Sequence, residues 1–211
     1  MTSPTALLYD AYYHIYNRGV NRENVFVEER NYFHFMNLYA KYIEPVAETF
    51  AYCLLRNHFH VLVKIRTEGE IKTCFKTLRV SKTLRVSESR VSEPSIQFSN
   101  LFNAYAKAIN KTYHRSGSLF QHPFGRVLVT NSTQFYRVVM YIHQNPQKHK
   151  FVNDYKEWKY SSYAVLLSSS PTRLQRGTVI EWFGGCDQFT RMHEDWVMER
   201  ESAWFPGDDD D

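Results

Sequence analysis

The amino-acid sequence predicts an α+β fold, an antiparallel β-sheet with helices packed on one face. Segments rich in aromatic and β-branched residues, which are typical of strands, alternate with segments of helical periodicity. Their order is strand, helix, strand, strand, helix, strand and then one more helix. The 211 residues are enough for one compact domain and leave little room for a second. We therefore expect one sheet and its helices to share a core.

The first half of this pattern is bordered by turn residues and proline. In chain order we expect a strand at 12–16, the turn Asn17-Arg18-Gly19, a helix at 28–43 ended by Pro45, a strand at 49–55, the tight turn Arg56-Asn57 and a strand at 58–65. The last two strands are expected to pair as an antiparallel hairpin.

The second half begins with a helix at 98–113 and a loop at 117–121, followed by a strand at 126–130. Ser132 or Thr133 is the expected N-cap of a helix at 134–145, and Pro146 is expected to end it. One more short element is indicated around 179–183. This order fits the split βαβ arrangement, a ferredoxin-like or RRM-like sheet.

The composition is that of a globular protein with a mild positive charge. Hydrophobic residues make up 43% and charged residues 23%, and the net charge of +4 permits a polyanionic partner without requiring one. Three scattered cysteines without a CxxC pair favour a reducing compartment. Residues 1–10 do not have the pattern of a signal peptide, and no apolar run is long enough to span a membrane. We expect a cytoplasmic protein without a membrane partner.

A short tandem repeat interrupts the pattern. Lys76-Thr77-Leu78-Arg79-Val80-Ser81 recurs unchanged at 82–87, and a degenerate third copy follows at 88–92. Six residues are too few for a solenoid unit. We expect a mobile, low-complexity insertion in a surface connection, and contact of its basic residues with DNA is the alternative.

Two histidines open the strand at 58–65. Residues i and i+2 of a strand point to the same face, so His58 and His60 are expected to project side by side. Phe59 and Leu62 are expected to point to the opposite, core face. Two imidazoles at this spacing make half of a metal site. The alternative is a pair of polar residues on the exposed face of a half-buried strand.

Tyr141 and Asn145 stand four residues apart on the helix expected at 134–145, and therefore on a common face. Taken alone, Tyr141 is more typical of an amphipathic helix, with its ring in the core and its hydroxyl in water.

Five blocks of sequence together resemble the REP-associated tyrosine transposases, relatives of the single-tyrosine transposases in the HUH superfamily of single-stranded DNA endonucleases. In chain order they are Tyr13-His14-Ile15-Tyr16-Asn17-Arg18-Gly19, Asn57-His58-Phe59-His60, Gly117-Ser118-Leu119-Phe120-Gln121, Tyr141-Ile142-His143-Gln144-Asn145-Pro146 and Trp158-Lys159-Tyr160-Ser161-Ser162-Tyr163. The match covers most of 12–163, and the repeat at 76–92 departs from it.

The resemblance implies a role for each matching residue. His58 and His60 match the pair that holds a divalent cation, and Asn145 matches a third ligand; this set suits Mg²⁺ or Mn²⁺. Tyr141 matches a nucleophile that cleaves a DNA strand through a 5′-phosphotyrosine intermediate, so that the strand can be rejoined to another end. Gln144 competes for the role of third ligand but faces about 100° away on a helix.

The resemblance also implies a bacterial protein whose partner is single-stranded DNA with hairpin or palindromic repeats, bound by a monomer or a homodimer. The expected DNA contacts are Asn17, Arg18, Lys107 and Arg126. Residues 1–166 are expected to form the transposase domain, with the insertion at 76–92, and 167–211 a C-terminal extension with a disordered end. Two alternatives stay open: a hairpin-binding protein that has lost catalysis, and an RRM-like RNA-binding module.

Overall fold

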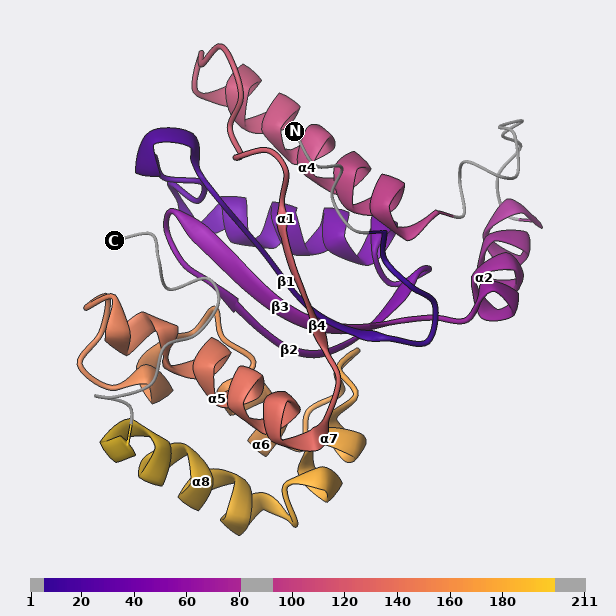
Figure 1. The fold of residues 1–211 in the computed structure, drawn as a ribbon. Coiled ribbons are helices and arrows are strands. Elements are labelled where there is room, and N and C mark those ends of the chain that lie inside the picture. Colours follow the sequence, from indigo (N-terminus) through magenta and orange to yellow (C-terminus); the bar gives the residue numbers. More distant parts are fainter. Residues whose placement is uncertain (1–5, 81–92, 200–211) are drawn as a thin grey trace.

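The computed structural model describes residues 6–80 and 93–199, and a four-stranded antiparallel sheet in the order β2-β3-β1-β4 lies at its centre (Figure 1). The strands are β1 (Tyr12–Arg18), β2 (Ala47–Leu54), β3 (His58–Ile65) and β4 (Gly125–Val129). The helices are α1 (Glu29–Tyr42), α2 (Glu68–Val80), α4 (Pro94–Thr112), α5 (Ser132–Lys148), α6 (Tyr163–Leu167), α7 (Arg176–Trp182) and α8 (Cys186–Glu199), with short 3₁₀ turns η1 (Val20–Arg22) and η2 (Tyr155–Glu157). None of the helices in these ranges is long and apolar enough to cross a membrane.

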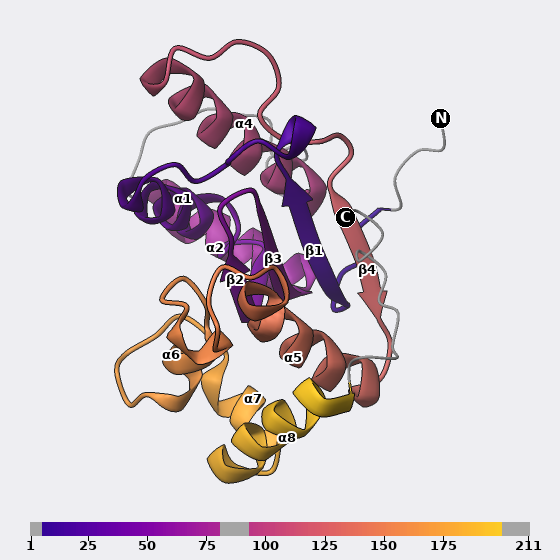
Figure 2. The same cartoon turned by 90° about the vertical axis from the view of Figure 1, so that its left-hand side faces the viewer.

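Helices cover both faces of the sheet. Figure 2 shows α1 and α4 on one side of the strands and α5 to α8 on the other. Two cores correspond to these layers, one containing Phe35 of α1 and Phe59 of β3, the other containing Leu62 of β3 and Val139 of α5. The predicted α+β fold with an antiparallel sheet is confirmed. The sequence analysis expected helices on one face of the sheet only. Helices α1 and α4 form that layer, and α5 with the helices after it forms a second layer on the opposite face.

The central strand β3 is buried along almost its whole length because both of its faces are covered. Phe59 and Val61 belong to the core under α1 and α4. The prediction that Leu62 lies with Phe59 was wrong, since Leu62 packs in the core under α5. A strand has a period of two, so Leu62 shares the face of His58 and His60.

Helix α5 begins and ends differently from its prediction. Its N-cap is Asn131, whose side-chain oxygen accepts a hydrogen bond from the backbone N–H of Gln134 at 2.9 Å, rather than Ser132 or Thr133. Pro146 lies inside the last turn, and the backbone N–H of His149 still donates to the carbonyl of Asn145 at 2.9 Å. Proline near a helix end removes one hydrogen bond without ending the helix.

Two further boundaries differ from the sequence prediction. β1 continues through Asn17 and Arg18, the residues expected in a turn, because they pair with Phe59 and His58 of β3. The first repeat copy, up to Val80, forms the end of helix α2 rather than a loop. The later copies and the terminal aspartates lie outside the described residues.

The segment after residue 167, expected as an extension, contributes to the second core. Val179 of α7 and Phe189 of α8 are fully buried there. A chain of buried polar groups also connects α8 to α5 and β2. His193 Nδ1 donates to the carbonyl of Phe189 at 2.7 Å, His143 Nδ1 lies 2.8 Å from His193 Nε2, and Ser162 Oγ lies 2.8 Å from His143 Nε2.

Burial keeps both imidazoles neutral, since it lowers the pKa of His193 to about 4 and that of His143 well below its usual value. The carbonyl of Phe189 can only accept, so the proton of neutral His193 is on Nδ1. His193 Nε2 then accepts from His143 Nδ1–H, and His143 Nε2 accepts from the hydroxyl of Ser162, which also lies 3.2 Å from the carbonyl of Tyr52. Ser162 Oγ in turn accepts the backbone N–H of Tyr52 at 2.8 Å.

We therefore expect stability to fall in mild acid. Well above pH 6.5 both histidines are neutral in the folded and unfolded chains and add no pH dependence. Between about pH 6.5 and 4 the imidazole of His193 becomes protonated in the unfolded chain but stays neutral in the folded chain. This change lowers the free energy of unfolding by about 3 kcal/mol for His193 alone, at about 1.4 kcal/mol per pKa unit.

Urea unfolding followed at several pH values measures this loss. His193→Gln keeps an acceptor for His143 but does not titrate, so its free energy of unfolding should fall less between pH 6.5 and 4 than that of the wild type. Equal slopes for the two proteins would contradict the assignment.

Candidate functional site

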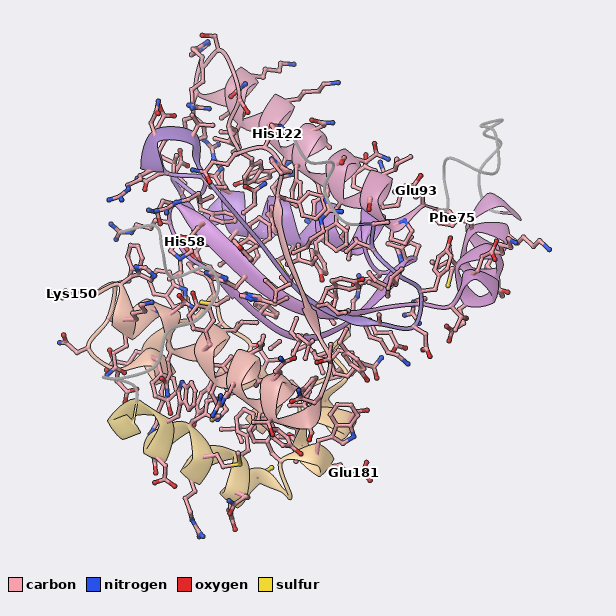
Figure 3. The ribbon with its side chains drawn as sticks, viewed as in Figure 1. His58, Phe75, Glu93, His122, Lys150 and Glu181 are labelled. Carbon is pink, nitrogen blue, oxygen red and sulfur yellow. The ribbon has the colours of Figure 1, made fainter. Side chains whose placement is uncertain are left out.

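The register between β1 and β3 gathers the polar residues of both strands on one face. Tyr16 lies opposite His60 and Arg18 opposite His58 in the antiparallel pair. Directly opposed side chains share a face, so these residues and His14 all point toward α5. Figure 3 shows His58 at the end of the sheet that lies near Lys150, just beyond the C-terminal end of α5.

Tyr141 of α5 lies against the histidines. Its ring centroid is 5.3 Å from that of His60 and 5.7 Å from that of His14, and both contacts are edge-on. The side chain is 2% exposed. The structure thus brings together Tyr141 and the histidine pair, which are more than 80 residues apart in sequence.

Asn145 lies one helical turn after Tyr141 and is completely buried. Its Nδ2 donates to the carbonyl of Tyr141 at 2.8 Å. Its Oδ1 has no hydrogen-bond partner among the described residues. A buried amide oxygen without a partner is costly, and a bound cation would satisfy it. Gln144, the competing candidate, instead donates to the carbonyl of His193 at 2.7 Å.

Hydrogen bonds to Nδ1 orient both histidines. His58 Nδ1 lies 2.7 Å from Asn57 Oδ1, and since that oxygen can only accept, the proton of His58 is on Nδ1. His60 Nδ1 lies 3.0 Å from His14 Nε2. Nε2 of His58 therefore keeps its lone pair, as a metal ligand requires.

Burial keeps both imidazoles neutral. It lowers the pKa of His58 to about 3, aided by electrostatic repulsion from the neighbouring His149, Arg18 and Lys148. It holds the pKa of His60 well below its usual value, aided by His14 and His58. A neutral imidazole is the form that binds a metal ion. Two neutral imidazoles and an unsatisfied amide oxygen therefore fit a divalent cation. Within 6–80 and 93–199 no group of three or more His, Cys, Asp or Glu is arranged to hold a metal ion, so the third protein ligand would have to be Asn145.

The residues predicted to contact DNA separate onto two faces. Arg18 shares the face of His58. Asn17 is buried, and its strand position directs it toward α1 and α4. Arg126 lies on that side too, with Nη1 3.3 Å from Ser95 Oγ of α4. Lys107 is exposed on α4. Only Arg18 of the four adjoins the histidine pair.

Three residues at the site were not predicted from sequence. His14 contacts His60, as described above. Lys148 Nζ lies 5.6 Å from the ring centroid of Tyr141, and the ring of His149 is 4.8 Å from that of His58. The spacing of Lys148 from Tyr141, seven residues on one helix face, is a signal that could have identified it. It was overlooked because Pro146 was expected to end the helix first.

Tyr16 also borders the site, and its position requires a glycine on the neighbouring strand. Its ring stacks on His60 with centroids 5.8 Å apart. On β4, Gly125 is paired with Tyr16, and a Cβ atom at Gly125 would overlap the tyrosine ring. The missing side chain of Gly125 therefore allows Tyr16 to lie flat over the strand.

We expect Gly125→Ala to displace the Tyr16 ring and disturb His60. The overlap should lower the free energy of unfolding, measured by urea denaturation, by about 1–3 kcal/mol, as overpacking does. Gly177→Ala on α7 is the control, because a Cβ there has nothing within 4 Å and alanine favours a helix. Wild-type stability of the Gly125 variant would refute the packing argument.

Comparisons with known proteins agree with the resemblance read from the sequence. No family model matches the chain. A curated protein of Haemophilus influenzae named as a REP-associated tyrosine transposase is 25% identical over 118 residues. The matched part is 55% of this chain and 58% of that protein, so the chain spans less than two thirds of its relative.

A solved structure of a REP-associated tyrosine transposase bound to a REP hairpin has the same fold. The TM-score is 0.55 at 14% sequence identity, and the match covers 81% of this chain and 89% of the other. The predicted resemblance is therefore confirmed: the chain is similar in sequence and in fold to the REP-associated tyrosine transposases.

Proposed function

We propose that this chain is a metal-dependent single-stranded DNA endonuclease and strand transferase that acts at hairpin or palindromic repeats. One observation carries the proposal. The ring of Tyr141 lies against His60, and one turn later Asn145 carries a buried oxygen without a partner. The proposed nucleophile therefore lies against one candidate ligand, His60, and one helical turn from another, Asn145.

The chemistry follows from these groups. The Tyr141 oxygen attacks the phosphorus of a phosphodiester, the bond from phosphorus to the 3′ oxygen breaks, and the phenolic proton is transferred to the leaving 3′ oxygen, which becomes a hydroxyl. The product is a 5′-phosphotyrosine, which keeps the energy of the broken bond so that a 3′ hydroxyl can rejoin the strand. A cation held by His58, His60 and Asn145 would polarise the scissile phosphate.

The covering of Tyr141 sets a condition for this reaction. The side chain is 2% exposed, so a DNA strand reaches its hydroxyl only after the segments around it move. Arg18 and Lys148 lie on the same face and would provide phosphate contacts to the entering strand.

Hairpin DNA is the proposed partner because the transposase of similar fold was solved with a REP hairpin. RRM-like RNA binding is less compatible with this fold. That mode stacks bases on an open sheet face, whereas helices cover both faces of this sheet (Figure 2). Loss of catalysis is also disfavoured, since the chain keeps Tyr141, His58, His60 and Asn145, the residues proposed for these roles.

The first test is the nucleophile. Tyr141→Phe removes only the hydroxyl, so strand cleavage should be lost while the fold and DNA binding persist. The wild type should form a denaturation-resistant adduct on a single-stranded hairpin oligonucleotide and little on the full duplex, because attack needs an unpaired strand.

Tyr136→Phe is the matched control. Tyr136 is on the same helix, but its hydroxyl donates to the carbonyl of Trp182 at 3.0 Å, outside the site. This variant should form the adduct normally. Mass spectrometry should place the nucleotide on Tyr141, and a nucleotide on another residue would refute the mechanism.

The second test is the cation. His58→Ala or His60→Ala should abolish cleavage and Mn²⁺ binding. Affinity for the oligonucleotide should change little, because phosphate contacts provide most of it. Circular dichroism checks that the variants fold. Undiminished cleavage by the wild type in excess EDTA would show that no divalent metal takes part.

A further inference from the structure

His14 lies at the centre of the site without being one of its candidate ligands. It is in the middle of β1, is 3% exposed and points toward α5. Its Nε2 is 3.0 Å from Nδ1 of His60. The ring also packs on His60, with centroids 5.1 Å apart, and on Tyr16 at 5.2 Å.

We propose that His14 is a positioning residue that holds His60 in the tautomer able to bind a cation. The inference rests on the proposed function and extends it to a residue that would touch neither the cation nor the DNA. Its basis is the hydrogen bond between the two imidazoles, together with the ring packing that fixes their orientation.

The geometry permits two positions of the proton. A neutral imidazole carries one N–H, and the contact between His14 and His60 needs one proton between its two nitrogens. If His14 donates, the proton of His60 is on Nε2, which then has no lone pair for a cation. If His60 donates from Nδ1, His14 accepts at Nε2 and the Nε2 lone pair of His60 is available. The second arrangement is the one able to bind a cation, and His14 provides the acceptor that holds His60 in it.

The neighbouring ligand is oriented in the same way. His58 also uses Nδ1 in a contact with a side chain next to the site, in its case the carbonyl oxygen of Asn57 at 2.7 Å. Each of the two candidate histidine ligands thus has a dedicated partner on Nδ1. Partners of this kind typically change metal affinity 10- to 100-fold when removed.

The chain offers a matched control in its other imidazole pair. His143 Nδ1 lies 2.8 Å from His193 Nε2, so His193 accepts from His143 as His14 is proposed to accept from His60. Both pairs are buried and their rings stack. His193 is on α8 and has no contact with His58 or His60. Replacing it removes the same kind of acceptor without touching the candidate ligands.

Calorimetry with Mn²⁺ on the full chain, without DNA, is the first measurement. His14→Phe keeps a flat ring but removes the acceptor, and should weaken Mn²⁺ binding 10- to 100-fold. His14→Gln offers an amide oxygen to Nδ1–H and should restore most of the affinity. His193→Phe should destabilise the fold yet bind Mn²⁺ as the wild type does.

The second measurement needs no metal. Nitrogen-15 NMR of the histidine rings distinguishes the two tautomers, and wild-type His60 should carry its proton on Nδ1. In His14→Phe that population should shift toward Nε2–H. A wild-type His60 with its proton on Nε2 would overturn the proposal even if a variant failed to fold.

Measuring His58→Ala in the same way distinguishes failure of the positioning role of His14 from failure of the cation site itself. If His58→Ala loses Mn²⁺ binding while His14→Phe retains wild-type affinity, the role of His14 is overturned and the proposed function stands. If neither variant changes the affinity, the cation site itself is refuted, and the positioning role is refuted with it.

Discussion

The register between β1 and β3 is the constraint on which the site depends. Seven residue pairs, from Tyr12 with Lys64 to Arg18 with His58, fix which side chains lie opposite one another. A shift by one residue would turn every side chain of β1 to the other face. His14 would then lose its contact with His60, and Arg18 would leave His58. The apolar residues between them, such as Ile15 and Phe59 in the core under α1 and α4, keep the register in place.

Burial of the histidines follows from the second helical layer. With only α1 and α4 present, His58 and His60 would lie on an open face of the sheet, where their imidazoles would titrate near their usual pKa. The layer of α5 to α8 covers that face and lowers both pKa values. The same layer places Tyr141 beside the histidines. One packing arrangement therefore brings Tyr141, the proposed nucleophile, close to the histidines and keeps the candidate ligands in their metal-binding form.

Sequence patterns predicted the features that depend on local periodicity. β3 was predicted with its observed ends, and the prediction that His58 and His60 share a face agrees with the register. Features that depend on tertiary contacts were missed. Pro146 was expected to end α5, although one proline in a last turn costs a single hydrogen bond. The packing of α8 on α5 could not be read locally, because it depends on contacts such as His143 with His193, 50 residues apart.

The two imidazole pairs show why similar contacts have different consequences. In the pair under α8, protein groups occupy every ring nitrogen: Phe189 and His143 bind the two of His193, and His193 and Ser162 bind those of His143. No ring nitrogen of this pair is available to bind a ligand. Its hydrogen bonds connect α5 to α8 and to Ser162, so we infer a structural role for the pair. His58 and His60 are satisfied only at Nδ1, and in the described part of the chain neither forms a hydrogen bond at Nε2. Asn145 Oδ1 is left without a partner on the facing helix. A cation at this position would satisfy the buried Asn145 Oδ1, so this difference in saturation supports the pair at the start of β3, rather than the pair under α8, as the proposed cation site.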